Sequence, residues 1–333
     1  MSYSYLIYFL FNFTVFFMCA KISYKFKLVD IPNERKIHSE PTAFTGGIAI
    51  IVILLFALKA INVFDKNLGL IFSFGFLISI VGLIDDKFHL NTGGKLSLQI
   101  FPIIYLIVFE NFSLNDIGDY EYFNLMLGTF AIPFTLFCVL FLINAFNYLD
   151  GIDGTLSFTT ISVLFILFFL VKDQTIELFF IIIIIPLIIF LFFNFSLFKL
   201  PKLFLGDNGS LLLGFIISFV LIYLANSNLV HHILLAWSVA IFVYEFLTIN
   251  IIRLMNNQNP FKAGQDHIHH LLFHKTKSIF ATNFFICLLN IIFFMIGYFS
   301  FLTINTLSSF TLYIFIFIIF FLLRYKYAKK IIK

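Results

Sequence analysis

Residues 175–195 read TIELFFIIIIIPLIIFLFFNF, and this run decides what kind of protein the chain forms. A helix crosses the hydrocarbon core of a bilayer, about 30 Å thick, with roughly 17 to 25 residues. The run has the length and the apolar character of such a crossing. It therefore predicts a transmembrane helix.

Ten further stretches are apolar and of similar or slightly shorter length. The chain of 333 residues is 61% hydrophobic and only 11% charged, whereas roughly a quarter of the residues in a soluble domain are charged. The mean hydropathy is +1.05. We therefore predict an all-α integral membrane protein, a single domain over residues 1–333 with about 11 transmembrane helices, or ten if the short stretch 96–110 does not cross. The predicted helices are 3–20, 46–64, 67–84, 96–110, 125–143, 155–171, 175–195, 209–225, 229–252, 278–301 and 306–323.

The basic residues are distributed unevenly around these stretches. None precedes the first stretch, whereas Lys21, Lys25 and Lys27 follow it, which favours an N-terminus outside over the alternative of a cleaved signal peptide. In that orientation 18 Lys and Arg residues lie in the odd-numbered loops and the C-terminal tail, and three lie in the even-numbered loops. Cytoplasmic loops are enriched in Lys and Arg. We therefore predict that the odd-numbered loops and the C-terminus are cytoplasmic.

Uncommon polar residues gather in five odd-numbered loops, whereas the even-numbered loops look like plain connectors. Taken alone, an Asp-Gly pair is an ordinary turn and a Lys-rich loop is an ordinary determinant of topology. Five clusters on one face, several beside helix ends where a buried charge is costly, indicate a single site. They are residues 30–38 (DIPNERKIH), 82–86 (GLIDD) with Lys95, 144–154 (NAFNYLDGIDG), 204–210 (FLGDNGS) and 259–270 (NPFKAGQDHIHH).

The side chains in these clusters are mainly oxygen donors, which indicates a hard cation. Mg²⁺ takes one or two protein oxygens and binds substrate phosphates, and Mn²⁺ accepts similar ligands. A diphosphate substrate is therefore implied, with Arg35, Lys36, Lys95 and the imidazoles of 267–270 available to offset its charge. Zinc is the alternative metal, although the His-x-His-His run lacks a carboxylate or thiolate partner. The candidate oxygen ligands are Asp85, Asp86, Asn147, Asp150, Asp153 and Asp207.

The sequence argues against several other chemistries. Cys19, Cys138 and Cys287 lie in apolar runs without the spacing of a disulfide framework or a thiolate metal site. The net charge of +4 is small, so no nucleic-acid partner is expected. The glycine-rich phosphate loops of nucleotide hydrolases and Rossmann folds do not occur. GLIDD is followed by KFH, so the third Asp of a prenyl-transferase motif is missing.

In their order and spacing the clusters resemble those of the polyprenyl-phosphate N-acetylhexosamine-1-phosphate transferases, integral membrane enzymes that start bacterial cell-envelope polysaccharides. The match runs from Asp30 to about Leu272. It includes DxPxxRKxH followed by Pro41 and the GG pair Gly46-Gly47, GxxDD with a Lys nine residues later, NAxNxxDGxDG, GDxGS, and PF followed by DHxHH. The resemblance implies a bacterial inner-membrane enzyme that transfers a sugar-1-phosphate from a UDP-N-acetylhexosamine to undecaprenyl phosphate and releases UMP.

The resemblance also implies roles for individual residues. Asn147 and Asp207 correspond to the family's Mg²⁺ ligands, Asp85 to an Asp that activates or positions the lipid phosphate, and Lys95 to a Lys that contacts the diphosphate. We expect the catalytic residues to be Asp85, Asp86, Lys95, Asp150, Asp153, His267, His269 and His270. We expect substrate contacts from Arg35, Lys36, His38, Asn144 and Asn147.

Finer features bear on the branch of the family. The histidine run is DHIHH rather than three consecutive histidines, which favours an enzyme of O-antigen, teichoic acid or capsule synthesis over the alternative, a phospho-MurNAc-pentapeptide transferase of peptidoglycan synthesis. Gln265 and Asp266 stand where members of the family often have an Arg, so the contact to the sugar stays open. The sequence also leaves open whether the chain forms a homodimer.

Two other classes of protein are alternatives to an enzyme, and one acid outside the five clusters also needs an explanation. A secondary transporter has its site near the membrane midplane, on broken helices and often in a repeated chain, and no repeat of the motifs is found here. A catalytically inactive scaffold would not need every motif acid. Glu245 lies inside a predicted helix, where a carboxylate is a functional candidate. We expect it to pair with Arg253 or to line a lipid groove.

Overall fold

The run quoted above forms helix α7 (Gln174–Asn194) in a computed structural model that describes residues 2–32, 40–61, 65–260, 264 and 266–332. Pro186 lies inside this helix and has no N–H, so the carbonyl of Ile182 four residues earlier loses its helical partner. The hydroxyl of Tyr8, on helix α1 (Ser2–Lys25), donates to that carbonyl at 2.9 Å. The buried proline is therefore compensated by a neighbouring helix, as a membrane interior requires.

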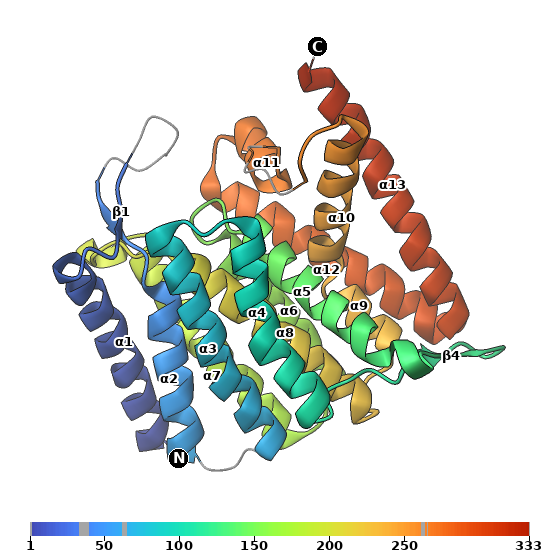
Figure 1. The fold of residues 1–333 in the computed structure, drawn as a ribbon, viewed down its shortest axis with the longest axis horizontal. Helices are drawn as coiled ribbons and strands as arrows, with labels where there is room; N and C mark the ends of the chain where they lie inside the picture. The colour runs from blue at the N-terminus through green and yellow to red at the C-terminus, as the bar shows by residue number, and fades with distance from the viewer. Residues whose placement is uncertain (1, 33–39, 62–64, 261–263, 265, 333) are drawn as a thin grey trace.

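Thirteen α-helices make up most of the described chain, so the predicted all-α class is confirmed (Figure 1). Among the residues that the structure describes, eight helices are long and apolar enough to cross a membrane, and the bent pair α9–α10 makes a ninth if it is one span. Helices α2 and α6 have only 16 residues each, which corresponds to about 24 Å. The exact number of 11 spans is therefore not confirmed. The remaining helices are α2 (Gly46–Ile61), α3 (Lys66–Phe88), α4 (Thr92–Phe109), α5 (Ala131–Leu149), α6 (Thr155–Leu170), α8 (Asp207–Asn226), α9 (His232–Ser238), α10 (Ala240–Met255), α11 (Ile268–Thr276), α12 (Ile279–Thr303) and α13 (Thr306–Ile332).

Several predicted helix boundaries were wrong. Two helices extend past their apolar stretches into the polar motif residues that follow. α3 runs on through Asp85 and Asp86, and α5 runs on through Asn144 and Asn147, so these four residues lie on helix ends rather than in loops. α5 begins six residues later than predicted, because strand β4 (Asn124–Met126) pairs with β3 (Asp116–Asp119) before it. The even-numbered loop at 111–130 is therefore an ordered ribbon and not a plain connector. A second antiparallel pair joins β1 (Val29–Asp30) to β2 (Thr42–Ala43).

Helix α8 lies at the centre of the bundle, where α2, α3 and α5 pack around it. In the apolar stretch of α8 that could cross a membrane, 89% of the residues are buried inside the protein, against 11% in the corresponding stretch of the peripheral helix α13. Two motif glycines permit the close approach. A Cβ at Gly82 of α3 would lie 2.4 Å from the Cα of Asn208, and a Cβ at Gly47 of α2 would lie 2.2 Å from the backbone nitrogen of Gly209. The GG, GxxDD and GDxGS motifs thus share one packed junction.

This junction predicts a large effect of a single methyl group. In Gly82→Ala the added Cβ meets backbone atoms that cannot rotate away, so α3 and α8 must separate, at a cost of about 1–3 kcal/mol or more. Gly69→Ala, on the same helix, is the matched control, because its Cβ would meet only the Leu58 side chain at 3.5 Å. We expect a lower thermal midpoint in detergent for Gly82→Ala alone. Equal midpoints for the two variants would contradict the packing argument.

A break between α9 and α10 bends this pair by 71°. Asn290 of α12 partners the interrupted backbone: its side chain donates to the carbonyl of Ser238 at 3.1 Å and accepts from the N–H of Ile241 at 3.4 Å. Backbone groups at a buried helix break need such partners. The bend turns α10 toward the end of the bundle that carries α11, as Figure 1 shows.

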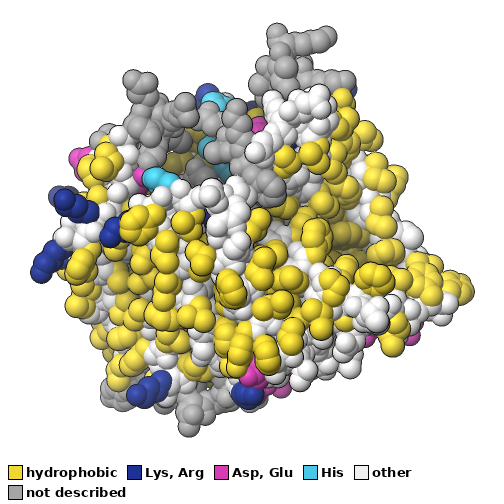
Figure 2. Space-filling model, viewed as in Figure 1, with side chains coloured by type: hydrophobic (Ala, Val, Ile, Leu, Met, Phe, Trp, Pro, Cys, Tyr) yellow, Lys and Arg dark blue, Asp and Glu magenta, His cyan; other side chains and the backbone are white. Residues whose placement is uncertain are grey.

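The outer surface has the band expected of a membrane protein. Figure 2 shows hydrophobic side chains over the middle of one face, with Lys and Arg at its edges and His near its upper end. The chain begins at the lower end of the bundle and finishes at the upper end (Figure 1). The junction of β1, α11 and the ends of α3, α5 and α8 lies at that upper end, so the motif residues gather at one face.

Candidate active site

The floor of the site consists of two motif segments that hydrogen-bond to each other. The N–H of Phe204 donates to the carbonyl of Ala43 at 2.7 Å, and Gly46 and Gly47 donate to the carbonyls of Phe204 and Leu205, each at 3.0 Å. This pairing joins residues 43–47 to residues 203–205. It brings Gly46 and Gly47, which follow the first cluster in the chain, and the fourth cluster, about 160 residues further on, together at the start of α8.

Asp86, on α3, forms hydrogen bonds that link this helix to the start of α8. Its two carboxylate oxygens accept the N–H groups of Asp207 and Asn208 at 2.9 and 3.1 Å, and also the side-chain amide of Asn208 at 2.7 Å. An anion at a helix N-terminus satisfies free N–H groups and the positive end of the helix dipole. The geometry therefore assigns Asp86 to holding α8, and its predicted catalytic role stays a prediction.

Beside this cap, Lys95 lies between two acids. Its ammonium contacts Asp85 Oδ2 at 2.7 Å and also binds Asp207 Oδ2. The amide of Asn147 donates to Asp207 Oδ1 at 2.9 Å and to Ser210 Oγ at 2.8 Å. Four predicted site residues from α3, α4, α5 and α8 therefore form one connected cluster. Charge-assisted bonds of this kind hold side chains in a fixed geometry.

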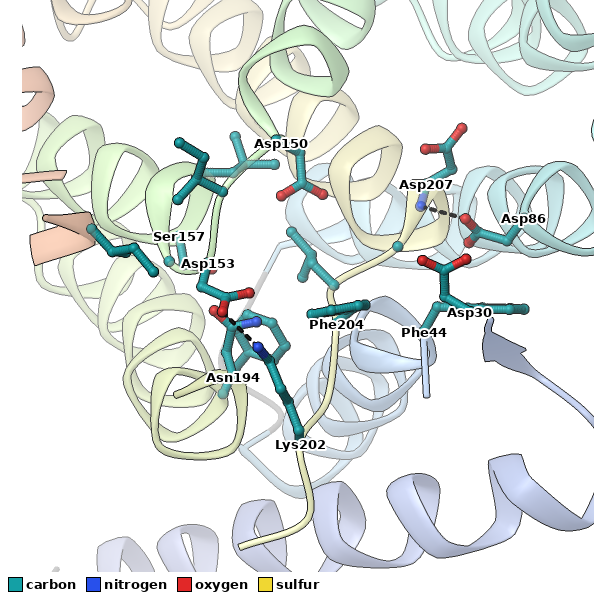
Figure 3. Close-up of a pocket in the computed structure, with 18 of the residues that line it drawn as sticks. Asp30, Phe44, Asp86, Asp150, Asp153, Ser157, Asn194, Lys202, Phe204 and Asp207 are labelled. Carbon is teal, nitrogen blue, oxygen red and sulfur yellow. Dashed lines mark hydrogen bonds and ion pairs between the residues drawn. The ribbon is translucent and has the colours of Figure 1, made fainter. Parts of the chain in front are cut away.

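The loop between α5 and α6 supplies two more acids. Asp153 forms an ion pair with Lys202 at 2.7 Å, and Asn283 of α12 donates to the carbonyl of Asp153 at 2.9 Å. Asp150 points into the cavity between Asp153 and Asp207 (Figure 3). Burial, then the charges of Asp207, Asp86 and Asp153, raise the pKa of Asp150 well above its usual range.

The raised pKa predicts that Asp150 destabilises the metal-free fold. An acid whose pKa is higher in the folded state costs stability above its unfolded pKa, and the full cost is reached above the folded pKa. We therefore expect Asp150→Asn to raise the thermal midpoint in metal-free buffer at pH 8, with little change near pH 4. Asp153→Asn is the control, because it loses an ion pair and should give no rise. A rise of equal size at both pH values would contradict the electrostatic cause.

The histidine segment, residues 266–276, contains α11 and stands over this loop. His269 is only 1% exposed, and a Cβ at Gly151 would lie 2.1 Å from its Nε2, so the ring rests on the DGIDG loop. Among the described residues, none partners either ring nitrogen of His269. Burial, then Arg253, His270 and Arg324, lower the pKa of His267 to about 4, although Asp266 opposes the shift. Burial also lowers the pKa of His269 well below its usual range and lowers that of His270. The three imidazoles are therefore neutral at physiological pH.

These elements enclose a cavity of about 940 Å³. Five of the predicted catalytic residues line it: Asp85, Asp86, Asp150, Asp153 and His270. Asp207 lines it too, while Lys95, Asn147 and His269 contact lining residues from behind. Figure 3 shows the labelled acids around the space, with Phe204 between Asp153 on one side and Asp30 and Asp86 on the other, and Phe44 beside Asp30.

Some predicted residues lie elsewhere. Arg35, Lys36 and His38 fall outside the described residues. The side-chain amide of Asn144 donates to the Leu140 carbonyl of its own helix at 2.7 Å, and Asn144 does not line the cavity. The expected pairing of Glu245 with Arg253 is wrong, because Arg324 reaches Glu245 at 2.8 Å and Arg253 instead binds Asp266 at 2.6 Å.

Sequence reasoning also missed residues that build the site. Asn208 joins α2 to α8 by accepting from the N–H of Ile48 at 2.9 Å and donating to the carbonyl of Phe44 at 2.6 Å. Lys202 neutralises Asp153. Arg324 partners Glu245, and the isolated acid in an apolar helix was itself an indication that a basic partner exists, since a lone buried charge is costly.

The cavity carries an excess of negative charge. Within the described part of the chain, its lining includes six aspartates, Asp30, Asp85, Asp86, Asp150, Asp153 and Asp207, but only one lysine, Lys202. No group of three or more His, Cys, Asp or Glu side chains among these described residues could by itself hold a metal ion. Mg²⁺ needs only one or two protein oxygens, so the donor set suits that ion, and the ion would offset the excess charge.

Comparison with known proteins identifies the family that the chain resembles. The chain matches the model of glycosyl transferase family 4 over residues 68–225, a stretch that contains the clusters at 82–86, 144–154 and 204–210. It is 29% identical over 271 residues to the undecaprenyl-phosphate alpha-N-acetylglucosaminyl 1-phosphate transferase of Yersinia pestis, covering 79% of this chain and 74% of that protein. The protein of the same name in Escherichia coli K12 is 27% identical with the same coverage. A probable undecaprenyl-phosphate N-acetylglucosaminyl 1-phosphate transferase of Bacillus subtilis is 28% identical, covering 91% of this chain and 84% of that protein. The resemblance predicted from the motifs is thus confirmed: the chain is similar to glycosyl transferase family 4 over residues 68–225 and to these transferases over most of its length.

Proposed function

We propose that the protein transfers a sugar-1-phosphate from a UDP-N-acetylhexosamine to undecaprenyl phosphate, releases UMP and so starts a cell-envelope polysaccharide. The names of the relatives support undecaprenyl phosphate as the acceptor and N-acetylglucosamine as the first sugar to test. The observation that carries the proposal is the acidic cavity at one end of a bundle of membrane helices, with Lys95 between Asp85 and Asp207. A nucleotide sugar reaches such a place from water, and a lipid phosphate reaches it from the bilayer.

The chemistry is an exchange at one phosphorus atom. An oxygen of the lipid phosphate attacks the phosphorus that carries the sugar, the bond from that phosphorus to the bridging oxygen breaks, and UMP leaves with the bridging oxygen. The lipid phosphate is already a nucleophile, so mutual repulsion of the phosphates is the main obstacle. Lys95, fixed by two carboxylates, and the N–H donors of neutral histidines are preorganised to stabilise the developing charge.

A Mg²⁺ ion, with Mn²⁺ as a substitute, supplies the positive charge that this acidic cavity needs before it accepts a diphosphate. Asp207 and Asn147 would hold the ion through a carboxylate oxygen and the amide oxygen, because the two side chains are adjacent, with the Asn147 amide nitrogen 2.9 Å from Asp207 Oδ1. Asp85 lies on the other side of Lys95, 2.7 Å from the ammonium, where it can position the attacking phosphate. Hard oxygen donors are the ligands that this ion prefers.

We further propose that the cavity faces the cytoplasm of a bacterium and that the N-terminus lies outside. The distribution of basic residues, 18 on the predicted cytoplasmic side and three on the other, supports this orientation. It also gives the cavity access to cytosolic UDP-sugars. A transporter site would lie near the midplane of the membrane. This cavity is instead lined by residues at helix ends, with Asp85 and Asp86 at the end of α3 and Asp207 at the start of α8.

The proposal is tested by release of UMP. We expect the purified protein in detergent to release UMP from one of a panel of UDP-sugars, UDP-N-acetylglucosamine first, when Mg²⁺ and undecaprenyl phosphate are both present. Chelation of the metal should abolish the release and added Mg²⁺ should restore it. No UMP with any sugar would reject the activity. A burst of UMP from enzyme and UDP-sugar without lipid would instead contradict direct attack, since it indicates a covalent intermediate.

A further inference from the structure

Glu245 lies in helix α10 and is only 3% exposed, in an otherwise apolar region of the bundle. A buried carboxylate is stable only when it is paired and hydrogen-bonded. Its partner is Arg324 of the last helix, α13, whose side chain is 11% exposed. The guanidinium donates from Nη2 to Oε1 at 2.8 Å and from Nε to Oε2 at 3.1 Å. Two helices that are distant in sequence are thus joined by a two-pronged ion pair.

Both members of this pair also hold the backbone of the histidine segment. Glu245 Oε1 accepts the N–H of Ile268 at 2.7 Å, and Arg324 Nη2 donates to the carbonyl of Asp266 at 2.9 Å. Ile268 is the first residue of α11, whose N-cap His267 makes no side-chain capping bond. Glu245 therefore supplies the acceptor and the negative charge that a helix N-terminus needs.

The position of α11 matters for the cavity because of the two histidines that follow. His269 packs so closely on Gly151 that a Cβ there would lie 2.1 Å from its Nε2, and His270 lines the cavity itself. A shift of α11 by less than an ångström therefore moves both rings relative to the loop that carries Asp150. From this geometry we propose that Arg324 is a positioning residue for the reaction: through Glu245 and the Asp266 carbonyl, the last helix sets the position of the histidine segment over the site.

A second anchor limits the expected effect. Arg253 binds both carboxylate oxygens of Asp266, at 3.0 and 2.6 Å, and donates to the carbonyl of Pro260 at 2.6 Å. These contacts persist when Arg324 is replaced, so the segment stays attached but less well oriented. Loss of a residue that orients a functional side chain typically lowers activity 10–100-fold, and this range is the expected fall in turnover for Arg324→Gln.

The first test does not depend on the activity. Hydrogen–deuterium exchange of the full-length protein in detergent should show faster exchange over residues 266–276 in Arg324→Gln, with exchange of α8 unchanged. Lys326→Gln is the matched control, because Lys326 is an exposed basic residue on the same helix. Unchanged exchange of the segment in Arg324→Gln overturns the proposal, whatever reaction the protein performs. Arg324→Lys, which keeps the charge but loses the planar fork, should give an intermediate result and serves if the Gln variant fails to fold.

The second test rests on the proposed function and uses UMP release. Arg324→Gln leaves the Glu245 carboxylate unpaired near the histidines, whereas the double variant Glu245→Gln, Arg324→Gln removes that charge and keeps an acceptor for the Ile268 N–H. We therefore expect the double variant to recover part of the turnover lost in Arg324→Gln. The acid limb of the pH profile should also move to higher pH in Arg324→Gln alone, because loss of a positive charge beside His267 favours its protonation. A merely smaller folded fraction would leave the pH profile unchanged. An unchanged pH profile together with wild-type turnover in Arg324→Gln overturns the positioning role. If neither the unaltered protein nor any variant releases UMP, the proposed function is contradicted. The hydrogen–deuterium exchange result then still decides whether Arg324 positions the histidine segment.

Discussion

Asp207→Asn is expected to lower the turnover number for UMP release by about 10³-fold, the upper range for loss of a preorganised charge at a reacting centre. The substitution keeps the size of the side chain and removes the negative charge that Lys95 binds and that Asn147 donates to. It also removes the carboxylate proposed to hold the metal ion, so the Mg²⁺ concentration for half-maximal activity should rise. The measurement is UMP release at a series of Mg²⁺ concentrations.

Asp119→Asn is the control for this variant, because Asp119 is an exposed acid on strand β3. It should retain the activity and the Mg²⁺ dependence of the unaltered protein. Normal turnover in Asp207→Asn, with normal dependence on Mg²⁺, would reject the role proposed for Asp207. A fall in activity with an equal fall in thermal midpoint would assign Asp207 to the stability of the junction instead.

Lys95→Met is expected to lower turnover by about 10²- to 10³-fold and to destabilise the protein by about 3 kcal/mol. The side chain of Lys95 is 13% exposed and is shared between Asp85 and Asp207. Its loss leaves two neighbouring carboxylates without their cation, so they repel each other and the incoming phosphates. Lys87→Met, an exposed position on the end of α3, is the matched control.

Mg²⁺ should distinguish the two effects of Lys95→Met. If the ion lies against Asp207, high Mg²⁺ should restore part of the lost stability, because a cation again offsets the carboxylates, but it should not restore turnover. The thermal midpoint with and without Mg²⁺ and the rate of UMP release measure the two effects separately. Full activity in Lys95→Met would mean that the ammonium has no part in the reaction.

The sequence predicted the positions of the membrane helices better than it predicted where the helices end. The apolar runs located the membrane helices because crossing a bilayer requires about 20 consecutive apolar residues, which leaves a pattern in any such sequence. The pattern misplaced helix ends, as at Asp86 and Asn147, because helices continue into water beyond their apolar part. It also missed the β3–β4 ribbon, whose short strands leave no period to recognise.

For the site, the residue types predicted the kind of chemistry but not which contacts each individual residue makes. Asp85 and Asp86 are neighbours with the same side chain, yet one binds Lys95 and the other caps α8. Asn144 and Asn147 lie one turn apart, yet only the second reaches Asp207. Which partner each of two equal residues reaches depends on the rotation of its helix, and for α3 the close packing of Gly82 against Asn208 of α8 constrains that rotation.

By itself, the sequence determined the membrane class, the gathering of the motifs on one face and the resemblance to a transferase family, because composition, charge distribution and motif order are properties of the linear chain. Only the tertiary structure decided that Lys95 lies between two acids, that Asp150 is held in a raised-pKa environment and that Arg324 partners Glu245. The pairs Lys95–Asp207 and Glu245–Arg324 join residues 112 and 79 positions apart. Contacts of that kind follow from the geometry of packed helices, and no local pattern records them.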